Sequence, residues 1–279
     1  MPDPVIDADP VLAGVLLALT IAAEPREAFG APDDPLIDGL SAGSTGLEDN
    51  GSDAPDPWPD VLAMVSSLVN GSTAWQTTYA MIAAPDGDEY RAGLAGFTLR
   101  DGVLYELVRL YCDRQPGNVL EKYLDALRTE QLGELGAGFR RDWQLAAADP
   151  AFRAAQDEEH HRLFLRPAAE LAGSDGLGAL GQFVYYDAMV MHGAGGGWMG
   201  FAALRDQARR TAVPPADGGD ECRYLTAFLD SRHSVTRLLP ARPGMFRLES
   251  VQRELLGEGN LELERPLCWQ IGRRDFHLA

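Results

Sequence analysis

The segment AlaProAspGlyAspGlu, residues 84–89, carries the side chains best suited to moving a proton. Its proline, glycine and aspartates are typical of an exposed turn. A carboxylate in such a turn can act as a general base where a cleft partly desolvates it. The same side chain can instead cap the turn through its own backbone. The acidic spacing does not fit a calcium loop. Asp86 is therefore a candidate base or a turn-capping residue.

Two histidine-bearing segments offer further candidates. AspGluGluHisHis at 157–161 has metal-binding residue types, but adjacent histidines point in different directions on a helix, so a solvated charged face is predicted. His192 ends an apolar helical stretch, where it can line a cleft or bond to terminal carbonyls. The glycine run at 193–197 follows no strand and is not a nucleotide loop. We expect neither a metal nor a cofactor.

Helices must position most of these residues, because apolar side chains recur near the helical period along most of the chain. Asp149 followed by Pro150 predicts a helix start. Alternation at 90–100 predicts a short hairpin or small sheet. The predicted helices cover residues 59–69, 72–83, 102–113, 118–128, 137–147, 150–173, 176–192, 198–213, 219–237 and 246–256. The expected fold class is mainly α with a small β-sheet, built as two helical lobes around a central cleft.

Residues 1–57 differ in texture from residues 58–279 and are predicted to be an N-terminal extension to one two-lobed domain. The apolar run at 11–23 is too short to span a bilayer. The residues before it are acidic, whereas a secretory leader begins with basic residues. We therefore predict an amphipathic or buried helix and a cytoplasmic protein, with a degenerate export signal as the alternative. The stretch at 29–57, rich in Gly, Pro, Ser and Asp, is predicted to be a linker or mobile loop.

The composition limits the partners. A net charge of -18 repels nucleic acid and anionic membranes. It suits a cationic ligand, but such acidity is also common among soluble bacterial proteins that bind none, and this second interpretation is preferred. We expect a small-molecule substrate, no nucleic acid and no membrane. Cys112, Cys222 and Cys268 are odd in number and far apart, so they predict small buried hydrophobes rather than a disulfide framework.

Three charged residues on the later helical stretches are predicted to pair in the interior. Asp187, Arg210 and Arg232 could form a buried ion-pair network, because buried arginine and aspartate are expected to be paired. We interpret such a network as structural support for the cleft.

An ordered series of motifs runs from residue 58 to 272. The most specific are ALGQFVYYDAMVMHG at 179–193 and GGDE with FLDSR within 218–232. Shorter matches lie at 64–75, 86–97 and 256–263. The series resembles glycoside hydrolase family 46, the chitosanases, whose two lobes enclose a cleft for the cationic polymer chitosan. The resemblance implies inverting hydrolysis by one carboxylic acid and one carboxylate base.

The resemblance places the base at Asp86 and the acid, a glutamate in the family, at Val69. Valine cannot transfer a proton, and general acid catalysis contributes ~10²–10⁴-fold, so ordinary chitosanase activity is predicted to be weak or absent. Asp88 stands where the family has arginine, Arg91 where it has threonine, and Val103 where an aspartate grips a glucosamine ring. The residues expected to line the cleft are Val69, Asn70, Asp88, Tyr90, Arg91, Val103 and His192.

Three functions follow from this pattern, in order of preference. The first is a repurposed enzyme in which Asp86 acts as general base on a small, non-polysaccharide metabolite. Its reaction would be an elimination, dehydration, addition or cyclisation in bacterial natural-product biosynthesis. The second is an inverting hydrolase of chitosan oligosaccharides with a relocated acid, for which Asp88, Glu89 and Asp101 are candidates. The third is a non-catalytic binding protein that keeps the fold.

Overall fold

The computed structural model describes residues 56–83, 90–99, 102–193, 197–238 and 247–279. Within these ranges most of the chain is helical, and the strands form two small two-stranded sheets. The predicted fold class, mainly α with a small β component, is confirmed. The apolar run at 11–23 and the predicted linker lie outside the described residues. No helix in the described ranges is both long and apolar enough to cross a membrane.

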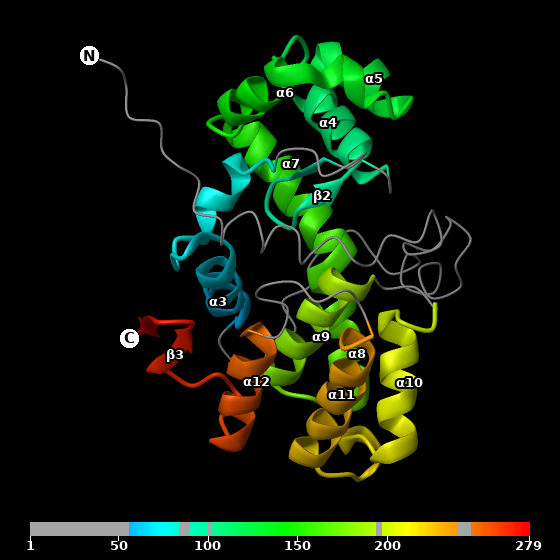
Figure 1. Ribbon diagram of the computed structural model, residues 1–279, viewed down its shortest axis with the longest axis vertical. Helices are drawn as coiled ribbons and strands as arrows, with labels where there is room; N and C mark the ends of the chain where they lie inside the picture. Colours follow the sequence, from blue (N-terminus) through cyan, green and yellow to red (C-terminus); the bar gives the residue numbers. More distant parts are fainter. Residues whose placement is uncertain (1–55, 84–89, 100–101, 194–196, 239–246) are drawn as a thin grey trace.

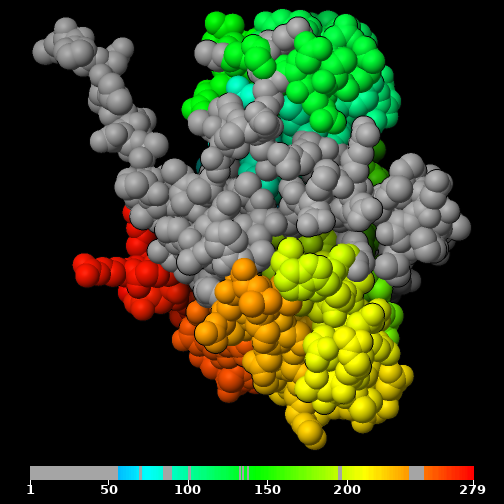
Figure 2. Space-filling model, turned by 45° about the vertical axis from the view of Figure 1, so that its right-hand side comes forward, coloured from blue at the N-terminus to red at the C-terminus, as the bar shows by residue number. Residues whose placement is uncertain are grey.

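The helices form two groups joined by a long helical rod (Figure 1). The upper group contains α4 (Val103–Arg114), η2 (Glu121–Tyr123), α5 (Leu124–Arg128) and α6 (Leu132–Ala146). The lower group contains α9 (Ala179–His192), α10 (Phe201–Thr211), η4 (Pro215–Asp217), α11 (Glu221–Thr236) and α12 (Arg247–Gly257). The rod consists of α7 (Pro150–His160), the π-helical η3 (His161–Leu165) and α8 (Arg166–Asp175). Figure 2 shows the green residues of the upper group and the yellow and orange residues of the lower group at opposite ends of one face.

Capping explains where the rod begins. Asp149 accepts a hydrogen bond from the backbone N–H of Ala151 at 2.8 Å, and Pro150 occupies the first turn. Such a cap contributes about 0.5–2 kcal/mol, and proline there has no N–H to leave unsatisfied. The predicted helix start at Asp149 is confirmed.

The rod is not the single α-helix predicted over 150–173. Between His161 and Leu165 the winding is π-helical, directly before Arg166 and Pro167. Proline has no N–H for the bond to the residue four positions earlier, and its ring clashes with that carbonyl. A π-turn is one way in which a helix accommodates such an interruption.

The helix predicted over 72–83 is wrong. α3 (Trp58–Asn70) ends at Gly71, whose φ of 64° lies in the left-handed region that ends many helices. The following residues form only a 3₁₀ helix, η1 (Trp75–Ala80). The hydroxyl groups of Thr77 and Thr78 bond to carbonyls three residues earlier, which competes with regular α-helical bonding.

The hairpin predicted at 90–100 is confirmed. β1 (Arg91–Ala92) pairs antiparallel with β2 (Phe97–Thr98), in the register Arg91 with Thr98 and Ala92 with Phe97. On its other side β1 meets the segment that follows η1. Ala83 donates to the carbonyl of Arg91 at 2.9 Å, and Gly93 donates to that of Met81 at 2.8 Å. The chain therefore leaves this small sheet at Ala83 and rejoins it near Tyr90.

A second hairpin at the C-terminus was not predicted. β3 (Leu267–Ile271) and β4 (Arg274–Leu278) pair antiparallel. β3 alternates buried and exposed residues, which is the pattern that could have identified it. Trp269 on β3 donates from Nε1 to Ser67 Oγ at 2.9 Å, and Arg265 Nε lies 2.9 Å from Asp60 Oδ2. The C-terminal hairpin and the residues just before it therefore contact α3, beside which the hairpin lies (Figure 1).

Not all of the three cysteines are buried as predicted. All are free; Cys112 and Cys222 are half-buried, and Cys268 is exposed. Cys268 occupies an outward position of β3, because its neighbours on either side face the core. The prediction that the cysteines serve as buried hydrophobes is therefore wrong for Cys268.

Candidate functional site

The sequence-predicted site begins at the end of α3. Val69 and Asn70 are the last two residues of that helix, and Gly71 caps it with its N–H bonded to Ser67 O at 3.1 Å. The described chain then passes through η1 to the small sheet and stops at Ala83. Asp86 and Asp88 lie in residues 84–89, outside the described residues. The roles proposed for these residues stay predictions.

Three other predicted cleft residues are buried next to this segment. Tyr90 packs edge-on against Phe139, with ring centroids 5.7 Å apart. Arg91 is the first residue of β1 and its side chain is 7% exposed. Val103 is the first residue of α4 and faces the core. Tyr90 and Val103 contribute to hydrophobic packing, and contact of any of the three with a ligand stays a prediction.

A buried ion pair joins α9 to α11. Arg232 Nη1 lies 2.7 Å from Asp187 Oδ2, and both side chains are almost fully buried. Gln252 on α12 donates to the same Asp187 oxygen at 3.0 Å and accepts from Arg232 at 3.1 Å. The predicted pairing of Asp187 with Arg232 is confirmed, and it holds three helices of the lower group together.

The predicted inclusion of Arg210 in that pair is wrong. Arg210 is exposed near the end of α10 and bonds to Gln207 Oε1, one turn earlier, at 2.9 Å. The face of α10 that packs inward carries Phe201, Leu204 and Ala208, so residue 210 points outward. Helical periodicity places Arg210 away from the interior.

His192 lies at the C-terminal end of α9 and is 5% exposed. Its ring hydrogen-bonds to the backbone of Met199 in the segment entering α10. Nε2 has no hydrogen-bond partner among the described residues. Burial, with the nearby positive charge of Arg232, lowers the pKa of His192 to about 3. The ring is therefore neutral near pH 7, and its contact with a ligand stays a prediction.

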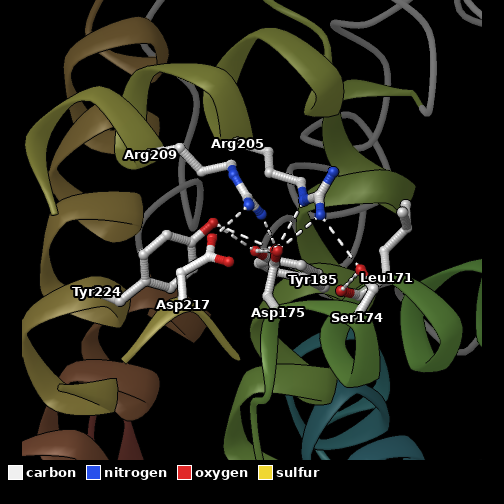
Figure 3. A network of polar contacts seen from close by, with 8 residues as sticks. All are labelled: Leu171, Ser174, Asp175, Tyr185, Arg205, Arg209, Asp217 and Tyr224. Atoms are coloured by element: carbon white, nitrogen blue, oxygen red, sulfur yellow. Dashed lines mark hydrogen bonds and ion pairs between the residues drawn. The ribbon is translucent and has the colours of Figure 1, made fainter. Parts of the chain in front are cut away.

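A second polar cluster, which sequence reasoning missed, surrounds Asp175 at the end of α8 (Figure 3). Asp175 is fully buried, and its carboxylate accepts hydrogen bonds from both Nε and Nη2 of Arg205, each at 2.7 Å. Tyr185 donates to it at 2.6 Å, Tyr224 lies 3.3 Å away, and Arg209 also bonds to it. The two arginines occur four residues apart on α10, a spacing that could have suggested a shared acidic partner.

The Asp175 cluster is structural in its chemistry. Burial alone would raise the pKa of Asp175, but the hydrogen bonds from Arg205 and Tyr185 outweigh it and the pKa lies below its ordinary value. A carboxylate held charged by two guanidinium groups is a poor proton carrier. The cluster instead joins α8, α9, α10 and α11 at one point.

The face predicted at 157–161 is not uniformly solvated, so that prediction is wrong in part. Glu159 and His160 are buried, and His160 Nε2 lies 2.9 Å from the hydroxyl oxygen of Tyr186. Burial lowers the pKa of His160 to about 3. Asp157 accepts from the hydroxyl of Tyr79 at 2.5 Å. Among the described residues, no three His, Cys, Asp or Glu side chains are arranged to hold a metal ion.

Comparisons with known proteins agree with this fold. Residues 63–267 match the family model of glycosyl hydrolase family 46. A chitosanase from Streptomyces sp. strain N174 is 42% identical over 227 residues, which cover 79% of this chain and 82% of that protein. A chitosanase from Nocardioides sp. strain N106 is 38% identical over 264 residues, covering 93% and 94%.

Solved structures give the same result in three dimensions. A chitosanase mutant from Bacillus subtilis MY002, complexed with 6 GlcN, superposes with a TM-score of 0.72 at 31% identity, covering 84% of this chain and 100% of that one. A Gynuella sunshinyii chitosanase in complex with chitotetraose gives 0.73 at 26% identity, covering 82% and 99%. The similarity spans both helical groups and the rod between them.

Proposed function

Because the chain belongs to glycosyl hydrolase family 46, we propose that it binds and hydrolyses glucosamine oligosaccharides. The observation that carries this proposal is the family match from residue 63 to 267, which includes every helix from α4 to α12. The relatives are named chitosanases, and two of the matched structures are complexes, one with 6 GlcN and one with chitotetraose. Nothing in these relatives favours the elimination or cyclisation of a small metabolite that we first expected, so hydrolysis takes precedence.

The charge of the protein supports a cationic substrate. With 42 acidic and 24 basic side chains, the chain has a formal net charge of -18. Such a field attracts a polymer of amino sugars and raises its association rate, more strongly at low ionic strength. We therefore expect binding to weaken as salt is added.

Inverting hydrolysis needs a base that activates water and an acid that protonates the leaving oxygen. We assign the base to Asp86, following the family pattern. The acid cannot be residue 69, because valine carries no proton to transfer. We propose that a nearby carboxyl group supplies this proton less effectively, and Asp88, Glu89 and Asp101 are the candidates.

The test is hydrolysis of glucosamine hexamer, followed by product analysis and by the anomeric configuration at early times. We expect slow cleavage with inversion, loss of cleavage in Asp86→Asn, and a gain of ~10²–10⁴-fold in Val69→Glu. Asp125→Asn is the control, since that carboxylate is exposed on α5. Asparagine or glutamine at each candidate acid then identifies the proton donor. Cleavage that survives Asp86→Asn would contradict the assigned base.

A second function is favoured by Val69 itself. A chain without its acid can bind the oligosaccharide and release it intact. Calorimetric binding of hexamer, with no products after prolonged incubation and equal affinity in Asp86→Asn, would support this binding protein. Detectable turnover that depends on Asp86 would exclude it.

A further inference from the structure

One tryptophan in this chain is displayed to solvent. All five tryptophans fall within the described ranges, and four of them are buried or half-buried. Trp198 is 63% exposed, whereas Trp143 is fully buried and Trp269 is 4% exposed. An indole ring offers a large apolar face and a π-system on which a ligand can pack.

The backbone around Trp198 is held in place. Phe201 donates to the carbonyl of Gly193 at 3.0 Å, and Gly200 donates to that of Gly197 at 2.7 Å. The buried ring of His192 bonds to the backbone of Met199, the next residue along. A side chain presented from a fixed backbone loses less conformational entropy when a ligand binds.

The position of this turn brings it toward the other half of the molecule. Residues 197–200 lead directly into α10, whose N-terminal end lies at the end of the lower group that faces the upper group (Figure 1). α11 packs along α10 after a short connection, so its C-terminal end reaches the same end of the group. Leu238 follows that end and is 69% exposed. Two exposed apolar side chains therefore occur at the end of the lower group nearest the upper group.

We propose that Trp198 binds a glucosamine unit of the oligosaccharide. The C–H face of a sugar ring packs on the indole face, and the ammonium group of an amino sugar is attracted to the same π-system. Among aromatic side chains, tryptophan attracts cations most strongly. This inference rests on the proposed function for the identity of the ligand. It adds a contact from outside residues 69–103, where the resemblance locates the acid, the base and the sugar-gripping residue.

The chemistry predicts selectivity as well as affinity. A glucosamine unit carries a positive charge at neutral pH, whereas its N-acetylated form does not. Both sugars can stack on the indole ring of Trp198, but only the charged glucosamine gains the cation–π attraction. Removing the ring should therefore weaken glucosamine binding more than binding of the acetylated oligomer.

The experiment measures calorimetric affinity in an Asp86→Asn background, with glucosamine hexamer and its fully N-acetylated counterpart. We expect Trp198→Ala to weaken hexamer binding by at least about two- to five-fold, the contribution of an exposed cation–π contact, and Trp198→Phe to recover part of it. Leu145→Ala is the matched control, because Leu145 is 58% exposed on α6 in the upper group. Tryptophan fluorescence should change on binding and lose that change in Trp198→Phe.

The outcomes separate this inference from the function on which it rests. Equal hexamer affinity in Trp198→Ala and the parent overturns the role of Trp198, and hydrolysis by the wild-type chain can still stand. Weakened binding in Trp198→Ala without hydrolysis by the wild-type chain supports the contact and refutes the hydrolase. Equal weakening by Leu145→Ala, or no binding by the parent, overturns the inference.

Discussion

The guanidinium of Arg274 lies against Gly71, in the space that a Cβ atom would fill. Gly71 directly follows Val69 and Asn70, and Arg274 comes from the C-terminal hairpin. Glycine thus meets two requirements here. It adopts a φ of 64°, and it leaves room for an arginine that comes from 203 positions later in the chain.

Gly71→Ala should therefore destabilise the protein by about 1 kcal/mol for the left-handed backbone, and further because Arg274 must move. Urea unfolding of Gly71→Ala and of Gly71→Ala/Arg274→Ala separates the two contributions. Gly257→Ala is the control, since a Cβ there meets nothing and its φ is not positive. If Gly71→Ala were as stable as Gly257→Ala, the left-handed cap would carry no cost.

Arg232→Met should cost about 3–5 kcal/mol of unfolding free energy, because it leaves the buried carboxylate of Asp187 without its cation. The double variant Arg232→Met/Asp187→Leu removes both charges and should recover a large part of that loss. Arg210→Met provides a matched arginine on the exposed face of α10 and should change stability little. Equal losses for Arg232→Met and Arg210→Met in urea titrations would contradict the buried pair.

Stability should fall as the pH drops below about 6.5. His160 and His192 are buried, and burial lowers their pKa values from 6.5 to about 3. Between these pH values each histidine binds a proton in the unfolded chain but not in the folded chain. The neutral rings therefore contribute stability fully above pH 6.5, and that contribution is lost as the pH falls toward 3. Each histidine adds a slope of about 1.4 kcal/mol per pH unit in this window.

The check is unfolding free energy against pH for the wild type and His160→Gln. Glutamine keeps a polar group near Tyr186 but does not titrate, so the slope between pH 6 and 4 should decrease by one proton. His277→Gln is the matched control substitution, because His277 is exposed on β4. An unchanged slope in His160→Gln would show that this histidine is not held neutral.

Substrates with good leaving groups should reveal the missing acid. An aryl glycoside of a glucosamine oligomer releases a stable phenolate and needs little protonation. Val69→Glu should therefore accelerate hydrolysis of the unmodified oligomer by ~10²-fold or more and leave the aryl substrate nearly unchanged. Parallel rate measurements on both substrates test this, and equal acceleration would assign another role to residue 69.

Local signals predicted most of the helices correctly. The helical period and the Asp149–Pro150 pair depend on neighbours a few residues away, which the sequence displays directly. The π-turn before Pro167 and the short 3₁₀ helix at Trp75–Ala80 arise where proline or threonine side chains compete with that period. The sequence shows the proline and threonine residues that cause these interruptions. Helical periodicity alone does not indicate that they override the α-helix.

Interior partners were harder to predict, because they depend on which helix faces meet. Asp187 forms its ion pair with Arg232, whereas Arg210 lies on the outward face of α10. The buried Asp175 cluster draws residues from four helices, and no short stretch of sequence contains it. The assignment of Asp86 as the base rests on the motif series alone.

The attachment of the C-terminal hairpin to α3 has a consequence for how the protein is made. Asp60 is synthesised 205 residues before Arg265, and Ser67 is synthesised 202 residues before Trp269. The helix that carries Val69 therefore cannot gain these contacts until the ribosome has synthesised the chain through Trp269. Deletion of residues 265–279 should consequently disturb the opposite end of the described chain.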